Sequence, residues 1–278
     1  MTPWQTKDPD KLKKIATDIR KSVVQSLTEA GSGHLGGSLG LADVFAVLYF
    51  SALHHDPSNP TWPYRDRVIL SIGHVAPVLY ATLAHAGYFP LTELHTLRKL
   101  GSRLQGHPGR DHGLPGLELS AGSLGQGLSV ASGMAIAGKL NKQHHKIYAI
   151  LGDGELQEGS VWESAMAASH HLLNNLIAIV DRNGVQIDGK TEDVMKLEPL
   201  EEKWKSFGWK VESCDGNDAG QLLEAFARVQ ETCTKPSVII AHTVMGKGIS
   251  SIEGDFHWHG KVPDPDQGQK FLRELSDE

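Results

Sequence analysis

Cysteine is scarce in this sequence, which contains only Cys214 and Cys233 among its 278 residues. Two cysteines are too few for a disulfide framework, and they are too far apart for a C-x-x-C metal or redox pair. We therefore expect two free thiols in a reducing compartment, which makes a cytoplasmic location the default.

Basic charge is not in surplus either, because 27 Lys and Arg stand against 33 Asp and Glu for a net charge of −6. Nucleic acids and anionic membranes attract clustered Lys and Arg, so neither is expected as a main partner. Long hydrophobic runs are also missing: the most apolar stretch, residues 41–53, is shorter than the ~18 residues that span a bilayer. Residues 1–14 lack the apolar segment of a signal peptide.

Short, mostly apolar runs rich in β-branched residues alternate with longer amphipathic or small-residue stretches. Such runs, bounded by Gly, Asp or Asn, are typical of strands covered on both faces of a parallel sheet; they span residues 67–72, 146–151, 176–181, 209–213 and 237–242. Helices are predicted over residues 10–30, 40–54, 76–86, 92–100, 124–141, 158–172 and 218–233. The alternation predicts a doubly wound α/β fold, with a mostly parallel sheet, helices on both faces and functional loops at the carboxyl ends of the strands.

The organisation of the chain predicts one domain, residues 1–250, because no internal repeat, low-complexity tract or long linker interrupts it. Residues 251–278 are polar and contain Pro263 and Pro265. We expect them to form a C-terminal arm that can reach another chain.

Two glycine-containing loops at predicted strand ends carry the chemistry. Residues 151–159 read Leu-Gly-Asp-Gly-Glu-Leu-Gln-Glu-Gly, and residues 180–185 read Val-Asp-Arg-Asn-Gly-Val. About thirty residues separate Asp153 from Asn183, the length of one crossover between adjacent parallel strands, so the two side chains should end side by side. A carboxylate and an amide oxygen supply part of an octahedral Mg²⁺ shell, which a diphosphate at the following helix N-terminus would complete.

These loops resemble the thiamine diphosphate motif, and further segments narrow the resemblance to the transketolase family. The segments occur in the order that the family uses and extend over nearly the whole chain: Ser32-Gly-His34, residues 65–74, Gly106-His-Pro108, residues 122–127 and Trp258-His-Gly260. The resemblance implies the thiamine diphosphate-binding α/β fold, with residues 1–250 as its diphosphate-binding domain. It also implies two-carbon ketol transfer between sugars or sugar phosphates, as in the pentose phosphate pathway.

The resemblance further implies roles for individual residues. A divalent metal, Mg²⁺ or in its place Ca²⁺ or Mn²⁺, would be held by Asp153, Asn183 and the carbonyl of Val185. Thiamine diphosphate would be contacted at its diphosphate by His74 and Gly154, and elsewhere by Gly122, Leu124, Glu158, Asn183 and Ile187. The substrate channel would be lined by the catalytic residues His34, His107 and His259.

Histidine is a residue type that this chemistry needs. Ketol transfer moves protons to and from sugar hydroxyls, for which imidazoles that are neutral near pH 7 are suited, while the cofactor stabilises the carbanion. Histidines outside the matched segments are expected to be surface or packing residues: His54, His55, His85, His95, His144 and His145. Glu158 and Glu163 resemble a family pair at a dimer interface, although helix-surface carboxylates are the simpler interpretation.

The match covers only the first domain of a full-length transketolase. In the family, a second α/β domain carries the glutamate that activates the aminopyrimidine ring, together with residues that grip the sugar phosphate, and this sequence ends at Glu278. We therefore expect the N-terminal subunit of a two-chain transketolase, which would bind a C-terminal partner subunit in an α₂β₂ assembly. Leu35, Gly36 and Gly37 depart from the Pro-containing loop of many members, which bears on substrate preference.

Two other interpretations stay open. A related thiamine diphosphate subunit, similar to 1-deoxyxylulose-phosphate synthase or to a 2-oxoacid dehydrogenase, would share the metal motif and would decarboxylate pyruvate. A non-catalytic binding subunit would keep only the fold. The intact Asp153, Asn183 and four motif histidines disfavour this second interpretation.

Overall fold

A parallel sheet organises the structure, a computed structural model that describes residues 5–231 and 234–276. Within those residues the sheet contains five strands in the order β1-β2-β3-β7-β6, and every neighbouring pair is parallel. The strands are β1 (Arg67–Leu70), β2 (Ile147–Gly152), β3 (Leu176–Arg182), β6 (Lys210–Asp215) and β7 (Ser237–His242). The strands predicted from the sequence are confirmed, with ends that differ by no more than two residues.

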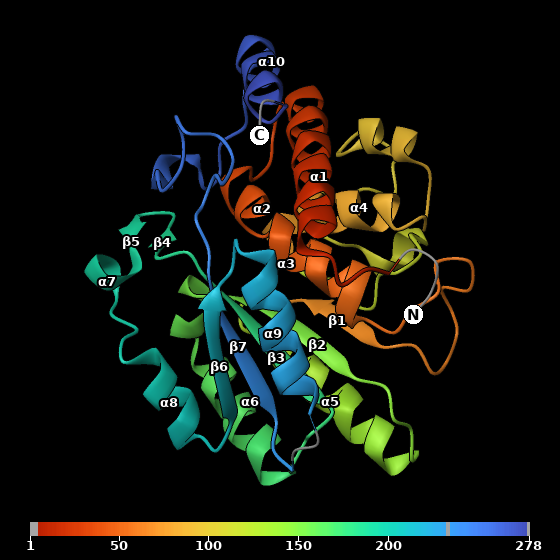
Figure 1. Ribbon diagram of the computed structural model, residues 1–278, viewed down its shortest axis with the longest axis vertical. Helices are drawn as coiled ribbons and strands as arrows, with labels where there is room; N and C mark the ends of the chain where they lie inside the picture. Colours follow the sequence, from red (N-terminus) through yellow and green to blue (C-terminus); the bar gives the residue numbers. More distant parts are fainter. Residues whose placement is uncertain (1–4, 232–233, 277–278) are drawn as a thin grey trace.

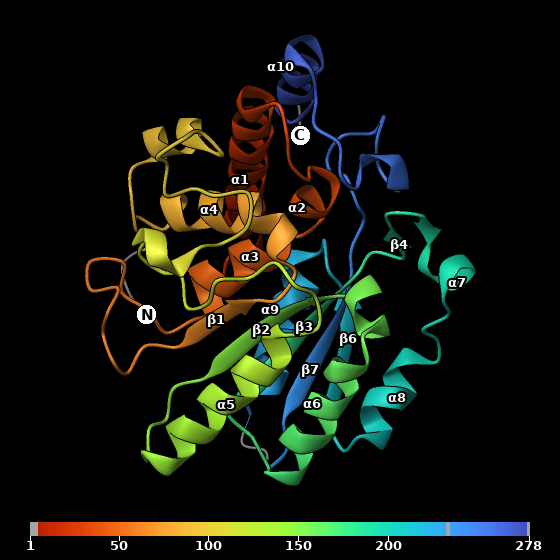
Figure 2. The ribbon, with the colours of Figure 1, turned by 180° about the vertical axis from the view of Figure 1, so that it is seen from behind.

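Helices cover both faces of the sheet, as Figures 1 and 2 show from opposite sides. One core is built by α1 (Pro9–Ala30), α3 (Ala42–Val47), α4 (Ala76–His85) and α9 (Ala219–Gln230). The other is built by α5 (Gly127–Leu140), α6 (Gly159–His170) and α8 (Leu200–Ser206). Because successive strand side chains point to opposite faces, Tyr148 joins the first core and Ala149 the second. The predicted doubly wound α/β fold is confirmed.

Local signals set the ends of the longest helix, α1. The Asp8 carboxylate accepts a hydrogen bond from the Asp10 backbone N–H at 3.1 Å, and Pro9 occupies the first helical position. The helix ends at Gly31, whose φ of 64° is a left-handed conformation that glycine adopts without strain.

Some predicted helices differ from the observed ones. Residues 92–100 form no α-helix but a 3₁₀ turn over Leu91–Thr96, because the chain reverses at Arg98, whose φ is 60°. Residues 40–54 divide into α3 and a π-helical turn, Leu48–Ala52. The remaining short elements are α2 (Gly36–Gly40), α7 (Thr191–Val194), the hairpin strands β4 (Val185–Gln186) and β5 (Gly189–Lys190), and 3₁₀ turns at Gly73–Val75, Arg110–His112, Gly154–Gln157 and Phe256–Trp258.

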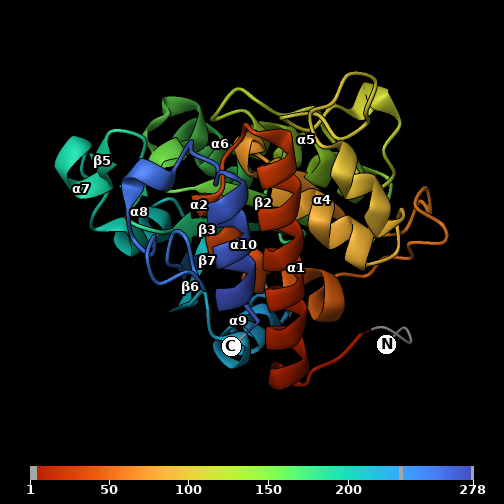
Figure 3. The ribbon, with the colours of Figure 1, turned by 90° about the horizontal axis from the view of Figure 1, so that it is seen from above.

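The expected C-terminal arm folds back onto the same chain. Helix α10 (Pro265–Glu274) lies beside α1 (Figure 3), with Phe271 buried and stacked edge-on against Trp258. A capping box of Asp264 and Gln267 starts this helix, which the sequence analysis did not predict. The boundary at residue 250 and contact with another chain stay predictions. Cys233 lies outside the described residues, whereas Cys214 is a buried free thiol.

No helix in the described parts of the chain is both long and apolar enough to pass through a bilayer.

Candidate active site

A cavity of about 380 Å³ opens at the carboxyl ends of β1, β2 and β3. Ligands of parallel α/β sheets bind at this edge, because the loops that follow the strands converge there. The cavity brings together residues from segments far apart in the sequence, among them these predicted site residues: His34, His74, Gly122, Leu124, Asp153, Gly154, Glu158, Asn183, Val185, Ile187 and His259.

The two glycine-containing loops lie side by side, as their spacing predicts. Strands β2 and β3 pair in register, with Gly152 opposite Asp181. Asp153 is 2% exposed, and its Oδ2 accepts a hydrogen bond of 2.8 Å from the backbone N–H of Gly184. The Asn183 side-chain oxygen accepts one of 3.0 Å from Val185 N–H. The Asp153 carboxylate and the Asn183 amide therefore lie close together at the end of two adjacent strands.

Arg182 is a hydrogen-bond partner of Asp153 whose role the sequence alone does not show. Its Nη1 donates to Asp153 Oδ2 at 2.9 Å and to the Thr191 hydroxyl at 2.6 Å, and its Nη2 pairs with Glu192 and Glu198 at 2.9 and 3.0 Å. Burial raises the pKa of Asp153, and the hydrogen bonds from Arg182 and Gly184 oppose that shift. The same guanidinium thus connects α7 and the segment after it to Asp153.

Asp181 orients the neighbouring asparagine. This buried carboxylate accepts a 2.9 Å hydrogen bond from Asn183 Nδ2 and another from the Thr243 hydroxyl. Because the amide nitrogen is held in this way, the amide oxygen of Asn183 is turned to the other side. Burial raises the pKa of Asp181 to about 7. In the sequence, Asp181 is only the last residue of a predicted strand, because nothing local marks it as a support for Asn183.

Four motif histidines from separate segments of the chain lie near one another, and three of them line the cavity with Asp153 and Asn183. The ring centroids of His34 and His74 are 5.1 Å apart, those of His34 and His259 are 5.7 Å apart, and those of His74 and His259 are 5.2 Å apart. Burial, followed by the other imidazoles, lowers the pKa of His34 to about 4 and that of His74 to about 3. The rings are therefore neutral near pH 7, as proton exchange with hydroxyls requires.

His107 is not part of the cavity wall. It is exposed, and its ring centroid lies 6.4 Å from that of His34. Its ring also borders Gly122, where an added Cβ would lie 3.9 Å from the imidazole. His107 thus lies beside the cavity residues His34 and Gly122.

Glu155 is a third residue whose role the sequence alone does not show. It is 1% exposed, and its carboxylate accepts hydrogen bonds from Gly125 N–H at 2.8 Å, from Gly152 N–H at 3.2 Å and from the Ser71 hydroxyl. The Ser71 oxygen in turn accepts one from Gly127 N–H at 3.0 Å, and a Cβ on Gly127 would overlap Ser71. Glu155 thereby joins the end of β1, the loop of residues 122–127 and the loop that follows β2.

The donor set fits a metal diphosphate. In the residues described, no three His, Cys, Asp or Glu side chains converge as a metal site, so the oxygens of Asp153, Asn183 and Val185 would need further oxygens from a ligand. The Nδ1 atoms of His34 and His259 are buried without a hydrogen-bond partner among those residues. Buried polar atoms of this kind are uncommon and mark a place where a polar ligand can bind.

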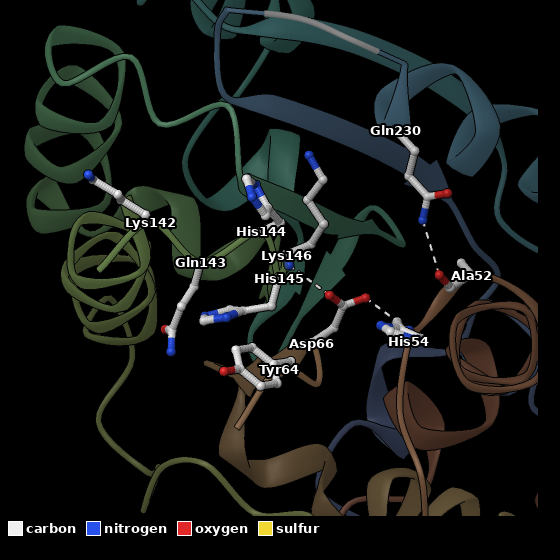
Figure 4. A pocket seen from close by; sticks show the side chains of 10 residues that line it. All are labelled: Ala52, His54, Tyr64, Asp66, Lys142, Gln143, His144, His145, Lys146 and Gln230. Atoms are coloured by element: carbon white, nitrogen blue, oxygen red, sulfur yellow. Dashed lines mark hydrogen bonds between the residues drawn. The ribbon is translucent and has the colours of Figure 1, made fainter. Parts of the chain in front are cut away.

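A second cavity, of about 520 Å³, lies at the opposite edge of the sheet, near the first residues of β1 and β2 (Figure 4). It is lined by Ala52, His54, Tyr64, Asp66, Lys142, Gln143, His144, His145, Lys146 and Gln230. The two Asp66 oxygens accept hydrogen bonds from His54 N–H at 2.9 Å and Lys146 N–H at 2.7 Å. Its carboxylate therefore joins two parts of the chain, and we assign the site to the carboxyl edge although that cavity is smaller.

Comparison with known proteins identifies the family. The family model described as "Transketolase, thiamine diphosphate binding domain" matches residues 11–274. A 6-deoxy-6-sulfo-D-fructose transketolase subunit from Clostridium sp. is 43% identical over 263 residues, which cover 95% of each chain. An apulose-4-phosphate transketolase subunit from Actinobacillus succinogenes is 43% identical over 278 residues, the full length of both chains.

Solved structures agree. The transketolase of Campylobacter jejuni superposes with a TM-score of 0.89 and 34% identity over 97% of this chain and 43% of that enzyme. The transketolase of Leishmania mexicana superposes with a TM-score of 0.90 and 33% identity over 95% of this chain and 41% of that enzyme. This chain thus spans less than half the length of these two enzymes. It belongs to the transketolase family, as the N-terminal, thiamine diphosphate-binding part.

Proposed function

We propose that this chain is the N-terminal subunit of a two-chain transketolase, which transfers a two-carbon ketol unit from a ketose to an aldose. The observation that carries the proposal is one cavity in which neutral histidines face the paired loops of Asp153 and Asn183. Relatives that match over nearly their whole length are named as transketolase subunits, which supports a separate partner chain.

The metal and cofactor would be held by the carboxyl edge of the sheet. We assign Mg²⁺, or Ca²⁺ or Mn²⁺, to Asp153, Asn183 and the Val185 carbonyl. The cofactor contacts would be made by His74, Gly122, Leu124, Gly154, Glu158, Asn183 and Ile187. When bound there, thiamine diphosphate supplies the nucleophilic carbon and stabilises the carbanion.

The chain's own contribution to the chemistry is proton transfer and orientation. The Nδ1 atoms of His34 and His259 are buried without a hydrogen-bond partner among the described residues, so each neutral imidazole offers a ring nitrogen that can accept a hydrogen bond, and in the reaction a proton, from a sugar hydroxyl. His107, beside the cavity, would hydrogen-bond the sugar as it enters. Glu155 and Asp181 keep the loops in place through bonds to backbone and amide groups.

The partner would be a C-terminal transketolase subunit that supplies the pyrimidine-binding domain. Apolar side chains are exposed next to the cavity at Ile187, Val194 and Met195. They support the proposal that the partner subunit packs against this surface. Exposed Leu140 and Met166 on α5 and α6 support self-association to α₂β₂ on that face. We also propose anionic sugars as substrates, because two relatives are named for a sulfonated and a phosphorylated sugar. A cytoplasmic location and a role in the pentose phosphate pathway remain predictions.

The test is ketol transfer by this chain with and without its partner subunit. We expect no turnover by the chain alone, freed of partner as checked by mass spectrometry, and turnover by the assembled enzyme with thiamine diphosphate and Mg²⁺. Pyruvate decarboxylation, measured in parallel, separates the related thiamine diphosphate activities. An assembled enzyme that decarboxylates pyruvate but transfers no ketol unit would overturn the proposal.

A further inference from the structure

The chain makes an unusual turn just before the loop that carries His107. Arg98 has a φ of 60°, a left-handed conformation that a long side chain seldom adopts. Its backbone N–H donates to the Leu104 carbonyl at 2.8 Å, which closes the turn, and Leu97 and Leu104 are both buried beneath it. The two leucines anchor the turn, so the Arg98 side chain starts from a defined position.

The Arg98 guanidinium lies near two of the three glycines that directly precede motif histidines. A Cβ on Gly106 would lie 2.7 Å from Arg98 Cζ, and a Cβ on Gly33 would lie 4.0 Å from its Nη1. Gly33 precedes His34, and Gly106 precedes His107. The missing side chain at Gly106 thus leaves room for the guanidinium, which also comes close to Gly33 and so lies beside both histidine loops.

The positive charge of Arg98 affects the imidazoles of His34 and His107. Burial is the largest cause of the lowered pKa of His34 and of His107, and the nearby positive charge of Arg98 lowers both further. Both histidines belong to the site proposed for the substrate. The guanidinium is exposed and lies outside the cavity wall, but it is close to the loops of two histidines proposed to contact the substrate.

Arg98 has no acidic partner among the residues that the structure describes, since no ion pair or side-chain hydrogen bond joins it to one of them. Arg103, in the same loop, shows the contrast: its guanidinium donates to both oxygens of Glu93, at 2.9 and 2.8 Å. A guanidinium whose donors are free, held next to a polar cavity, is suited to bind a tetrahedral oxyanion.

We propose that Arg98 binds the anionic group of the sugar substrate, a phosphate or a sulfonate, at the end remote from the reacting carbons. This inference rests on the proposed ketol transfer and deepens it. In the family, such groups are gripped by the second domain, so Arg98 would add a contact from this subunit. It would make this chain a determinant of preference for charged over neutral sugars.

The test compares two acceptors that differ in their charged group, D-glyceraldehyde 3-phosphate and D-glyceraldehyde, with the assembled enzyme. The variant Arg98→Asn removes the cation and keeps a residue that tolerates left-handed backbone. We expect the ratio of kcat/KM for the charged over the neutral acceptor to fall about tenfold, mainly through KM, as the loss of one charged hydrogen bond predicts. Arg98→Lys should restore part of the ratio.

The matched control is Lys99→Ala, which removes the same charge from the next, exposed position. Its ratio should equal that of the wild type. A ratio unchanged in Arg98→Asn, with both acceptors slowed equally or not at all, would overturn the inference, because Arg98 would then only shape the loops. A ketose with a terminal sulfonate, tested against its phosphate counterpart, shows which oxyanion is preferred. A wild-type enzyme without any ketol transfer would instead contradict the proposed function itself.

Discussion

The two edges of the sheet differ in how they use their polar groups. At the amino edge, Asp66 receives two backbone N–H groups and Gln230 donates to the Ala52 carbonyl at 3.1 Å, so these groups join segments of the chain. At the carboxyl edge, His34 and His259 keep buried Nδ1 atoms without a partner in the described chain. The larger cavity is at the amino edge, yet the groups available to a ligand are concentrated at the carboxyl edge. Cavity volume and the distribution of available polar groups therefore point to opposite edges of the sheet.

The difference between the two edges is tested most strongly at His259, where we expect the largest loss of activity. Replacing His259 by Ala should lower kcat of the assembled enzyme by ~10²–10⁴-fold, because the chemical step loses a proton donor and acceptor. Cofactor affinity and circular dichroism should stay close to those of the wild type. His74→Ala should instead weaken cofactor retention more than it lowers kcat. Steady-state kinetics at saturating cofactor separates the two, and a fully active His259→Ala would leave this ring without a role.

The metal loop should show the next largest effect. Asp153→Ala removes the one carboxylate proposed to bind the metal and leaves Arg182 facing an incomplete set of acids. Thiamine diphosphate affinity in the presence of Mg²⁺ should fall ~10–100-fold, the loss seen when ligand-orienting groups are removed. Calorimetric titration of the assembled variant measures this. Binding as tight as in the wild type would show that the metal lies elsewhere.

Replacing Glu155 should have a smaller effect on the site, because this carboxylate only holds the surrounding loops together. In Glu155→Gln the new amide group would face the N–H of Gly152, so one buried donor loses its acceptor. The free energy of unfolding should fall by ~1–3 kcal/mol. Cofactor affinity of the assembled enzyme should fall with it. Glu163→Gln is the matched control, because that glutamate is exposed on α6, and chemical denaturation of the two variants should separate them. Equal stability would mean that the buried carboxylate supports nothing.

Glu155 also shows where sequence reasoning ended. The pairing of Asp153 with Asn183 was predictable, since the crossover length and the parallel sheet decide which loops meet. The role of Glu155 was not, because it depends on contact with Ser71, a residue 84 positions away. Arg182 was missed for the same reason, because its partner Asp153 is 29 positions away. The family resemblance supplied the histidines, whereas the predicted helix at 92–100 failed because helical spacing does not reveal a reversal such as that at Arg98.

The lowered pKa of His34 makes stability depend on pH. The ordinary value is 6.5, and burial together with neighbouring charges lowers it to about 4 in the folded chain. Between these values the unfolded chain binds a proton that the folded chain does not, so the free energy of unfolding decreases as pH falls through this window. His34→Gln should lose this part of the slope, while Asp181 titrates in both proteins. Melting temperatures measured from pH 7 to pH 4.5 test the difference, and parallel curves would contradict it.

The smallest effect on activity is expected at the amino edge, at His145. This residue is a useful comparison with His259, because its Nδ1 is also buried without a partner among the described residues. Its ring packs against α5, where a Cβ on Gly138 would lie 3.4 Å from His145 Nε2. Since packing explains its place, His145→Ala should change ketol transfer and cofactor affinity by about twofold or less, as for most surface changes. The measurement is kcat/KM of the assembled enzyme, alongside His259→Ala. A loss at His145 comparable to that at His259 would mean that the two edges are functionally coupled, and the contrast drawn between them would fail.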